Sequence, residues 1–119
     1  MRDYTEIASI ERNGFDIIVD RTWEELDPRG HFDDCDIEEI CRKIDNGTYE
    51  WFMLRVRVLL DGHVFATEYL GGCLYEDPKE VLTDGVADDL IWNALCEARE
   101  EIARLREKLM AIDLDMMTE

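Results

Sequence analysis

Residues 51–70, WFMLRVRVLLDGHVFATEYL, contain two extended runs joined by Asp61-Gly62. An Asp-Gly pair readily adopts the positive φ angles of a two-residue hairpin turn. Before the turn every second residue is apolar, as in a strand with one buried face. The residues that this alternation places in the core are Phe52, Leu54, Val56, Val58 and Leu60. We therefore expect a β-hairpin formed by Thr48–Leu60 and His63–Leu70.

A second hairpin is expected at the N-terminus, where Tyr4–Arg12 and Phe15–Arg21 flank Asn13-Gly14. Asn-Gly is the other pair that favours a type I′ turn. With this turn setting the register, one face of the hairpin is apolar and the other carries alternating acidic residues. The predicted core residues of this hairpin are Ala8, Ile10, Phe15, Ile17 and Val19.

A short helix is predicted between the two hairpins, after a loop over Thr22–Asp34. Asp36 is suited to cap it, and Glu39 at the third helical position completes a capping box. Asn46-Gly47 provides the left-handed residue that ends a helix. The helical period predicts that this helix buries Ile37, Ile40, Cys41 and Ile44.

A long helix is predicted from about Asp84 to Ile112, because Gly71-Gly72 ends the preceding strand and an apolar period of alternating four and three residues follows. Its seam consists of Ile91, Leu95, Ala98, Ile102, Leu105, Leu109 and Ile112. The order β-β-α-β-β-α predicts an α+β fold, with a four-stranded antiparallel sheet packed against the long C-terminal helix. At 1.5 Å per residue this helix is about 42 Å long, more than a ten-residue strand spans, so its distal end is expected to project. Its seam either covers the sheet, which is the favoured arrangement, or pairs with the same seam in a homodimer.

The outer face of the sheet is predicted to carry Arg55 opposite Glu68 as a cross-strand ion pair. Trp51, Met53 and Leu70 are also expected there. Two arrangements are open: these side chains form an exposed apolar patch, or the Thr22–Asp34 loop covers them.

The length of 119 residues, 46% of them hydrophobic, predicts one α+β domain over residues 1–119. Charged residues interrupt the first ten positions and the longest apolar run, so we expect neither a signal peptide nor a membrane helix. Cys35, Cys41, Cys73 and Cys96 are irregularly spaced, which favours reduced thiols and a cytoplasmic location.

Motifs for catalysis and metal binding are absent from the sequence, and we expect no enzyme activity, cofactor or metal. A nucleophile pair of His63 with Cys73 is conceivable, but a lone cysteine is more often a small buried apolar residue. His31, Cys35 and Cys41 are close in sequence but lack the tight pairing of zinc ligands, and the nearby carboxylates lack the spacing of a calcium loop.

Acidity is the most unusual property of the chain, with 30 Asp and Glu against 13 Lys and Arg and a net charge of -17. Residues 24–39 alone hold eight acids and one base, Arg29. Such a charge disfavours direct binding to nucleic acid or an anionic membrane and favours a basic protein partner. The predicted partner-binding residues are Glu24, Glu25, Asp27, Asp33, Asp34, Asp36, Glu38, Glu39, Asp84, Asp88 and Asp89.

The stretch Glu68–Asp77, EYLGGCLYED, followed by Val81-Leu82 and the helical residues 87–99, resembles a pattern in small phage and prophage proteins. That class includes anti-CRISPR inhibitors, which bind RNA-guided defence complexes and often cover their basic nucleic-acid sites. The resemblance implies a non-enzymatic phage inhibitor that acts in the bacterial cytoplasm on a basic surface of a host complex. The alternative is a homodimeric phage accessory protein, assembled through the C-terminal helix, whose acidity serves only solubility.

Overall fold

The computed structural model describes residues 3–32 and 36–112, and it has the predicted α+β architecture. Four antiparallel strands lie in the order β1-β2-β3-β4. Their bounds are Thr5–Arg12 for β1, Phe15–Trp23 for β2, Glu50–Leu60 for β3 and His63–Tyr75 for β4. Helix α1 (Ile37–Asp45) lies between the hairpins, and α2 (Val86–Met110) follows the sheet. Two short 3-10 turns, η1 (Pro28–Gly30) and η2 (Pro78–Leu82), complete the described part.

Both hairpin turns form as predicted. Asn13 and Gly14 have φ angles of 56° and 85°, and Asp61 and Gly62 have φ angles of 50° and 80°. Positive φ at both central residues is the requirement of a type I′ turn. The first turn pairs Arg12 with Phe15, and the register that follows places the predicted apolar residues of both strands on one face.

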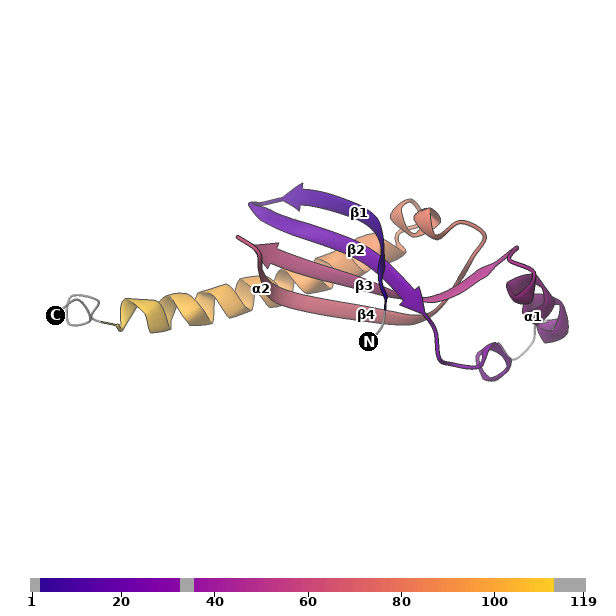
Figure 1. Cartoon of the computed structure of the whole chain (residues 1–119). Coiled ribbons are helices and arrows are strands. Elements are labelled where there is room, and N and C mark those ends of the chain that lie inside the picture. The colour runs from indigo at the N-terminus through magenta and orange to yellow at the C-terminus, as the bar shows by residue number, and fades with distance from the viewer. Residues whose placement is uncertain (1–2, 33–35, 113–119) are drawn as a thin grey trace.

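Helix α2 covers one face of the sheet (Figure 1). Its buried residues are Ala87, Leu90, Ile91, Ala94, Leu95 and Ala98. Ile102 is only partly buried, and Leu109 and Met110 are 64% and 77% exposed. The prediction that the distal end projects is therefore confirmed. None of the helices in residues 3–32 and 36–112 combines the length and apolar composition needed to cross a membrane.

The C-terminal part of β4 differs from the prediction in two ways. The strand continues through Gly71-Gly72 to Tyr75, because a bulge at the two glycines bends it without ending its pairing with β3. A second irregularity beside the hairpin turn shifts the register by one residue. Arg55 therefore lies opposite Tyr69, and the predicted Arg55–Glu68 pair is wrong.

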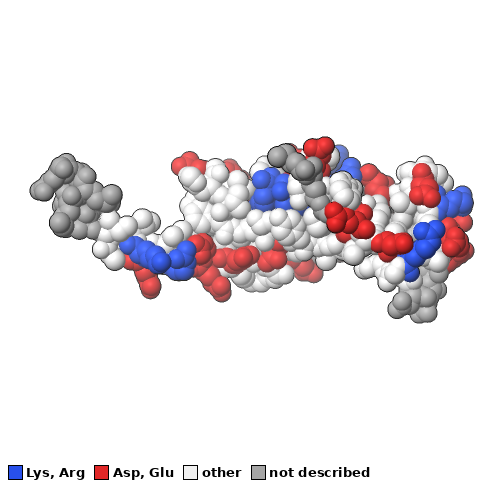
Figure 2. Space-filling view, turned by 60° about the horizontal axis from the view of Figure 1, so that its bottom comes forward, with Lys and Arg blue, Asp and Glu red and all other residues white. Residues whose placement is uncertain are grey.

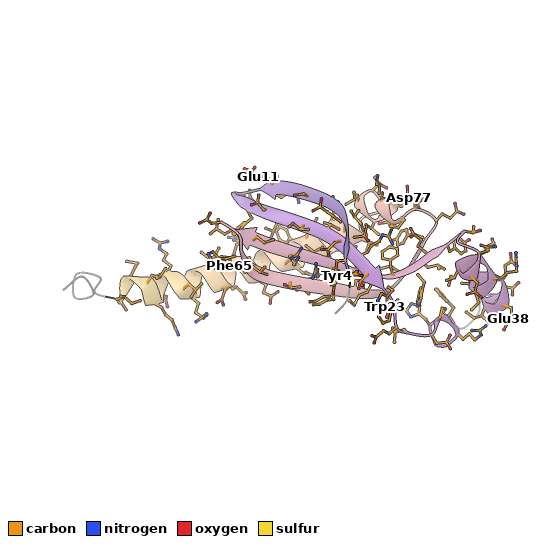
Figure 3. All side chains as sticks on the ribbon, viewed as in Figure 1. Tyr4, Glu11, Trp23, Glu38, Phe65 and Asp77 are labelled. Atoms are coloured by element: carbon orange, nitrogen blue, oxygen red, sulfur yellow. The ribbon has the colours of Figure 1, made fainter. Side chains whose placement is uncertain are left out.

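The outer face of the sheet is covered in part. The segment after β2 lies against Trp51, where the indole Nε1 of Trp51 donates a 2.8 Å hydrogen bond to the carbonyl oxygen of Leu26. Leu70, which was expected on this face, and Tyr69 remain 40% and 53% exposed. The rings of His31 and Phe32 contact the Trp51 indole edge-on and at a tilt. Of the two arrangements left open, covering by the loop is thus the correct one for Trp51. Further along the sheet Tyr4 covers Arg55, with the guanidinium 3.4 Å from the ring centroid (Figure 3).

Helix α1 lies beyond the end of the sheet and not on its face (Figure 1). Asp36 caps it as predicted, accepting a 3.3 Å hydrogen bond from the backbone N–H of Glu39. The predicted apolar face is only partly buried. Cys41 is 7% exposed, whereas Ile37, Ile40 and Ile44 keep intermediate exposure, and none of the four belongs to the main core.

Candidate protein-binding surface

The acidic segment Glu24–Glu39 extends from the end of β2 to α1, at the opposite end of the molecule from the projecting part of α2 (Figure 1). Asp33 and Asp34 lie outside the described residues. In the space-filling view this end of the molecule carries acidic and basic side chains interleaved (Figure 2). On this face, the described residues therefore do not form a uniformly negative surface.

Three acids of this segment, Glu24, Asp27 and Asp36, accept hydrogen bonds from backbone N–H groups. The Glu24 carboxylate accepts hydrogen bonds from the backbone N–H of Gly72 at 2.9 Å and of Leu26 at 3.1 Å. Asp27 accepts from the N–H of Arg29 and caps η1, as Asp36 caps α1. Glu24 is half-buried. These carboxylates satisfy backbone donors that would otherwise lack partners, and a structural role accounts for each of them.

Two further acids of the segment are paired with basic side chains. Glu39 bonds to the guanidinium of Arg42 and has the Lys43 ammonium at 3.8 Å. The hydrogen bond from Arg42 is the main cause that lowers the pKa of Glu39. Glu38, at the far end of the molecule in Figure 3, lies 3.9 Å from the Nε of Arg29. Glu25 is exposed.

The second group of predicted acids, at the start of α2, also contains both hydrogen-bonded and exposed carboxylates. Asp84 accepts a 2.6 Å hydrogen bond from the Tyr75 hydroxyl and a 3.0 Å bond from the N–H of Val86. Burial, and then this bond to Asp84, raise the pKa of Tyr75. Asp88 and Asp89 are exposed in the first turn of α2, where carboxylates interact favourably with the helix dipole. Neither forms an ion pair within the part of the chain that the structure describes.

The sequence analysis predicted Asp88 and Asp89 at the start of α2 but missed Glu97, Glu100 and Trp92 further along the solvent-facing side of the helix. Asp89, Glu97 and Glu100 are exposed on the helix, and no ion pair to any of them occurs among the described residues. Trp92 is 65% exposed on the same helix. A large exposed aromatic beside unpaired charge is typical of an interface centre. The helical period could have found these residues, because each of them falls outside the apolar seam.

The projecting part of α2 is different in charge. Figure 2 shows basic side chains gathered on it, with acidic side chains next to them towards the sheet. Arg104 is engaged by Glu101, while Arg99, Arg106 and Lys108 have no ion pair among the described residues. Helix α2 is thus acidic where it begins and richer in basic residues where it leaves the sheet.

The conceivable nucleophile pair is not assembled. His63 lies at the hairpin turn and Cys73 lies ten residues further along β4, which corresponds to about 33 Å of extended strand at 3.3 Å per residue. Burial raises the pKa of the Cys73 thiol to about 11, so the thiol is protonated at neutral pH. Within the described ranges, no three His, Cys, Asp or Glu side chains are grouped so that they could hold a metal ion. Cys35 lies outside those ranges.

Comparison of the chain with protein-family models, with curated proteins and with solved structures finds no match.

Proposed function

We propose that the protein is a non-enzymatic acidic inhibitor, of the kind represented by anti-CRISPR proteins, that occupies a basic nucleic-acid-binding surface of a host complex. The observation that carries the proposal is the row of exposed carboxylates Asp89, Glu97 and Glu100 on α2, which form no ion pair within residues 3–32 and 36–112, in a chain of net charge -17. Such a row on a rigid helix attracts a basic surface without first giving up an intramolecular ion pair.

The sign of these charges supports the comparison with nucleic acid. Asp89, Glu97 and Glu100 lie within eleven helical steps, about 17 Å of helix axis. Their average spacing of about 8 Å is wider than the 3.4 Å between the charges of a single nucleic-acid strand, so the row matches nucleic acid in sign and not in charge density. The acids of the Glu24–Glu39 segment are secondary contacts in this proposal, because most of the described ones already hold the backbone or pair with bases.

The test uses the tagged protein to retain complexes from a bacterial lysate at low salt and release them at high salt. Each released complex is then purified, and its binding to a labelled DNA or RNA is measured with and without the protein. The proposal predicts that the protein displaces the nucleic acid and that displacement weakens steeply with salt, because exposed charges are screened beyond a Debye length of about 8 Å at physiological ionic strength.

Two triple variants of equal charge make the test specific to α2. Asp89→Asn/Glu97→Gln/Glu100→Gln removes three charges from the α2 row, whereas Glu6→Gln/Glu11→Gln/Asp16→Asn removes three exposed charges from the first hairpin. The first variant should lose displacement and the second should retain it. Equal loss in both variants, or displacement that is insensitive to salt, contradicts the proposal.

A further inference from the structure

An apolar hollow of about 420 Å³ lies between the projecting part of α2 and the tip of the β3–β4 hairpin. Phe65 lies on the hairpin side, next to α2 (Figure 3). The apolar lining residues are Leu60 and Phe65 from the hairpin and Ile102, Leu105, Leu109 and Met110 from the helix. Arg106 contributes the only charged side chain among the described residues that line the hollow. Its volume lies within the range of small-molecule sites, about 300–1,000 Å³.

The walls of the hollow expose apolar side chains to solvent. Leu60 is 39% exposed, Leu109 64% and Met110 77%. Exposed apolar side chains that are grouped in this way are typical of a binding site. Methionine and leucine side chains adapt their shape to an irregular apolar ligand. The lining therefore favours a ligand with an apolar body.

The charge of the lining specifies the charge of the ligand. Arg106 is exposed and forms no ion pair within residues 3–32 and 36–112, although the whole chain has a net charge of -17. A guanidinium group binds carboxylates through parallel hydrogen bonds. A second copy of the chain fits less well, because a two-fold contact through the hollow brings the same cationic lining of both copies together.

The size and polarity of the hollow favour a small ligand over a polypeptide. An extended peptide needs hydrogen-bond partners for its backbone, and Arg106 is the only lining residue whose side chain is a strong donor. A single turn of helix, roughly 10 Å across and about 5.4 Å long, already occupies a volume of this size. An alkyl chain needs no hydrogen bonds, and one anionic group at its end is enough to pair with Arg106.

We propose that the hollow binds the alkyl chain of a fatty acid, with the carboxylate paired to the Arg106 guanidinium. The alkyl chain lies between the hairpin tip and α2, where it covers Leu60 and Leu109. None of the acids of the proposed inhibitor surface, Asp89, Glu97 and Glu100, lines the hollow. Fatty-acid binding is therefore a further function that does not depend on the proposed inhibition.

The test is isothermal titration calorimetry of the full chain with laurate below its micelle concentration. One laurate should bind per chain. Dodecyltrimethylammonium, which has the same alkyl chain and the opposite charge, should bind at least about tenfold more weakly. This comparison is stringent, because the net charge of -17 by itself attracts the cation and repels laurate.

Two pairs of matched variants locate the ligand. Leu109→Ser should weaken laurate binding about tenfold, whereas Trp92→Ser removes an equally exposed side chain of α2 that does not line the hollow. Arg106→Gln should also weaken binding about tenfold, whereas Lys108→Gln removes an exposed cation outside the lining. A neighbouring hollow of about 550 Å³ shares Arg106 but not Leu109, so Leu109→Ser distinguishes the two. Circular dichroism establishes that each variant is folded.

Four results would overturn the proposal. The first is a natural chain that does not bind laurate, and the second is equal binding of the cationic amphiphile. The third is equal laurate binding by Leu109→Ser and Trp92→Ser. The fourth is sedimentation of the natural chain as a dimer that Leu109→Ser converts to a monomer, which would assign the hollow to a second copy.

Discussion

Asp20 on β2 lies opposite Arg55 on β3, and the buried Asp20 carboxylate accepts hydrogen bonds of 2.7 and 2.5 Å from the Arg55 guanidinium. Asp20 is 3% exposed, although it lies on the face of the sheet that α2 does not cover. Arg57 adds a further bond at 3.2 Å, and Tyr4 covers Arg55. The hydrogen bond to Asp20 is the main cause that raises the pKa of Arg55. An ion cluster thus holds the N-terminal segment and the two central strands together.

Loss of the Asp20 charge should therefore destabilise the fold. Asp20→Asn leaves two guanidinium groups close together without a carboxylate, and removal of one partner from a buried pair costs about 3 kcal/mol. Asp16→Asn, an exposed change on the same strand, should stay within about 0.5 kcal/mol. Urea unfolding followed by circular dichroism compares the two. A cost for Asp20→Asn no larger than that of the control would show that the cluster contributes little.

Gly72 should be intolerant of any side chain for two separate reasons. Its φ angle is 71°, and a Cβ atom there would lie 2.7 Å from the His31 ring. Gly62 has a similar φ of 80° with open space around it, so Gly62→Ala measures the backbone cost alone, about 1–2 kcal/mol. We expect Gly72→Ala to cost clearly more than Gly62→Ala in thermal or urea unfolding. The excess should shrink in Gly72→Ala/His31→Ala, and an unchanged excess would exclude the ring contact as its cause.

The Cys73 thiol should make stability depend on alkaline pH. Burial raises its pKa from 9.0 to about 11, so the folded state keeps the proton that the unfolded chain releases. The resulting stabilisation is complete below pH 9 and is lost as the pH rises towards 11. The raised pKa of Tyr75 acts in the same direction. The unfolding free energy should fall more steeply between pH 9 and 11 in the natural chain than in Cys73→Ala, and parallel slopes would contradict the assignment.

The fold could be predicted because its decisive signals are local. Asn13-Gly14 and Asp61-Gly62 set two turns, and the alternation of apolar residues around each turn set which face is buried. The prediction that Arg55 pairs with Glu68 failed for a physical reason. A bulge shifts every later residue pair by one position, and no local residue preference indicates where the bulge occurs. The double glycine was read as a strand end, whereas it provides space for the loop that crosses it.

The candidate surface was harder to predict, because charge composition does not reveal which carboxylates are already engaged. Glu24 and Asp84 belong to acidic runs in the sequence, yet each holds a backbone N–H in the structure. Glu24 meets the N–H of Gly72 because the loop after β2 lies against β4, and Asp84 meets the N–H of Val86 at the start of α2. The 65% exposure of Trp92 also depends on the tertiary structure, because the sheet determines which side of the helix is covered.

Glu24 provides a direct measurement of this distinction between structural and surface acids. Its carboxylate bonds the N–H of Gly72 across 48 residues of sequence, and a hydrogen bond to a charged group contributes about 1.5–3 kcal/mol. Glu24→Ala should lower the unfolding free energy by that amount and speed hydrogen exchange at the Gly72 amide. Glu100→Ala removes an exposed charge from α2 and should change stability by no more than about 0.5 kcal/mol. If the two variants were equally stable and the Gly72 amide remained protected in both, the hydrogen bond from Gly72 to Glu24 would contribute nothing to stability, and Glu24 would be a surface acid available to a partner.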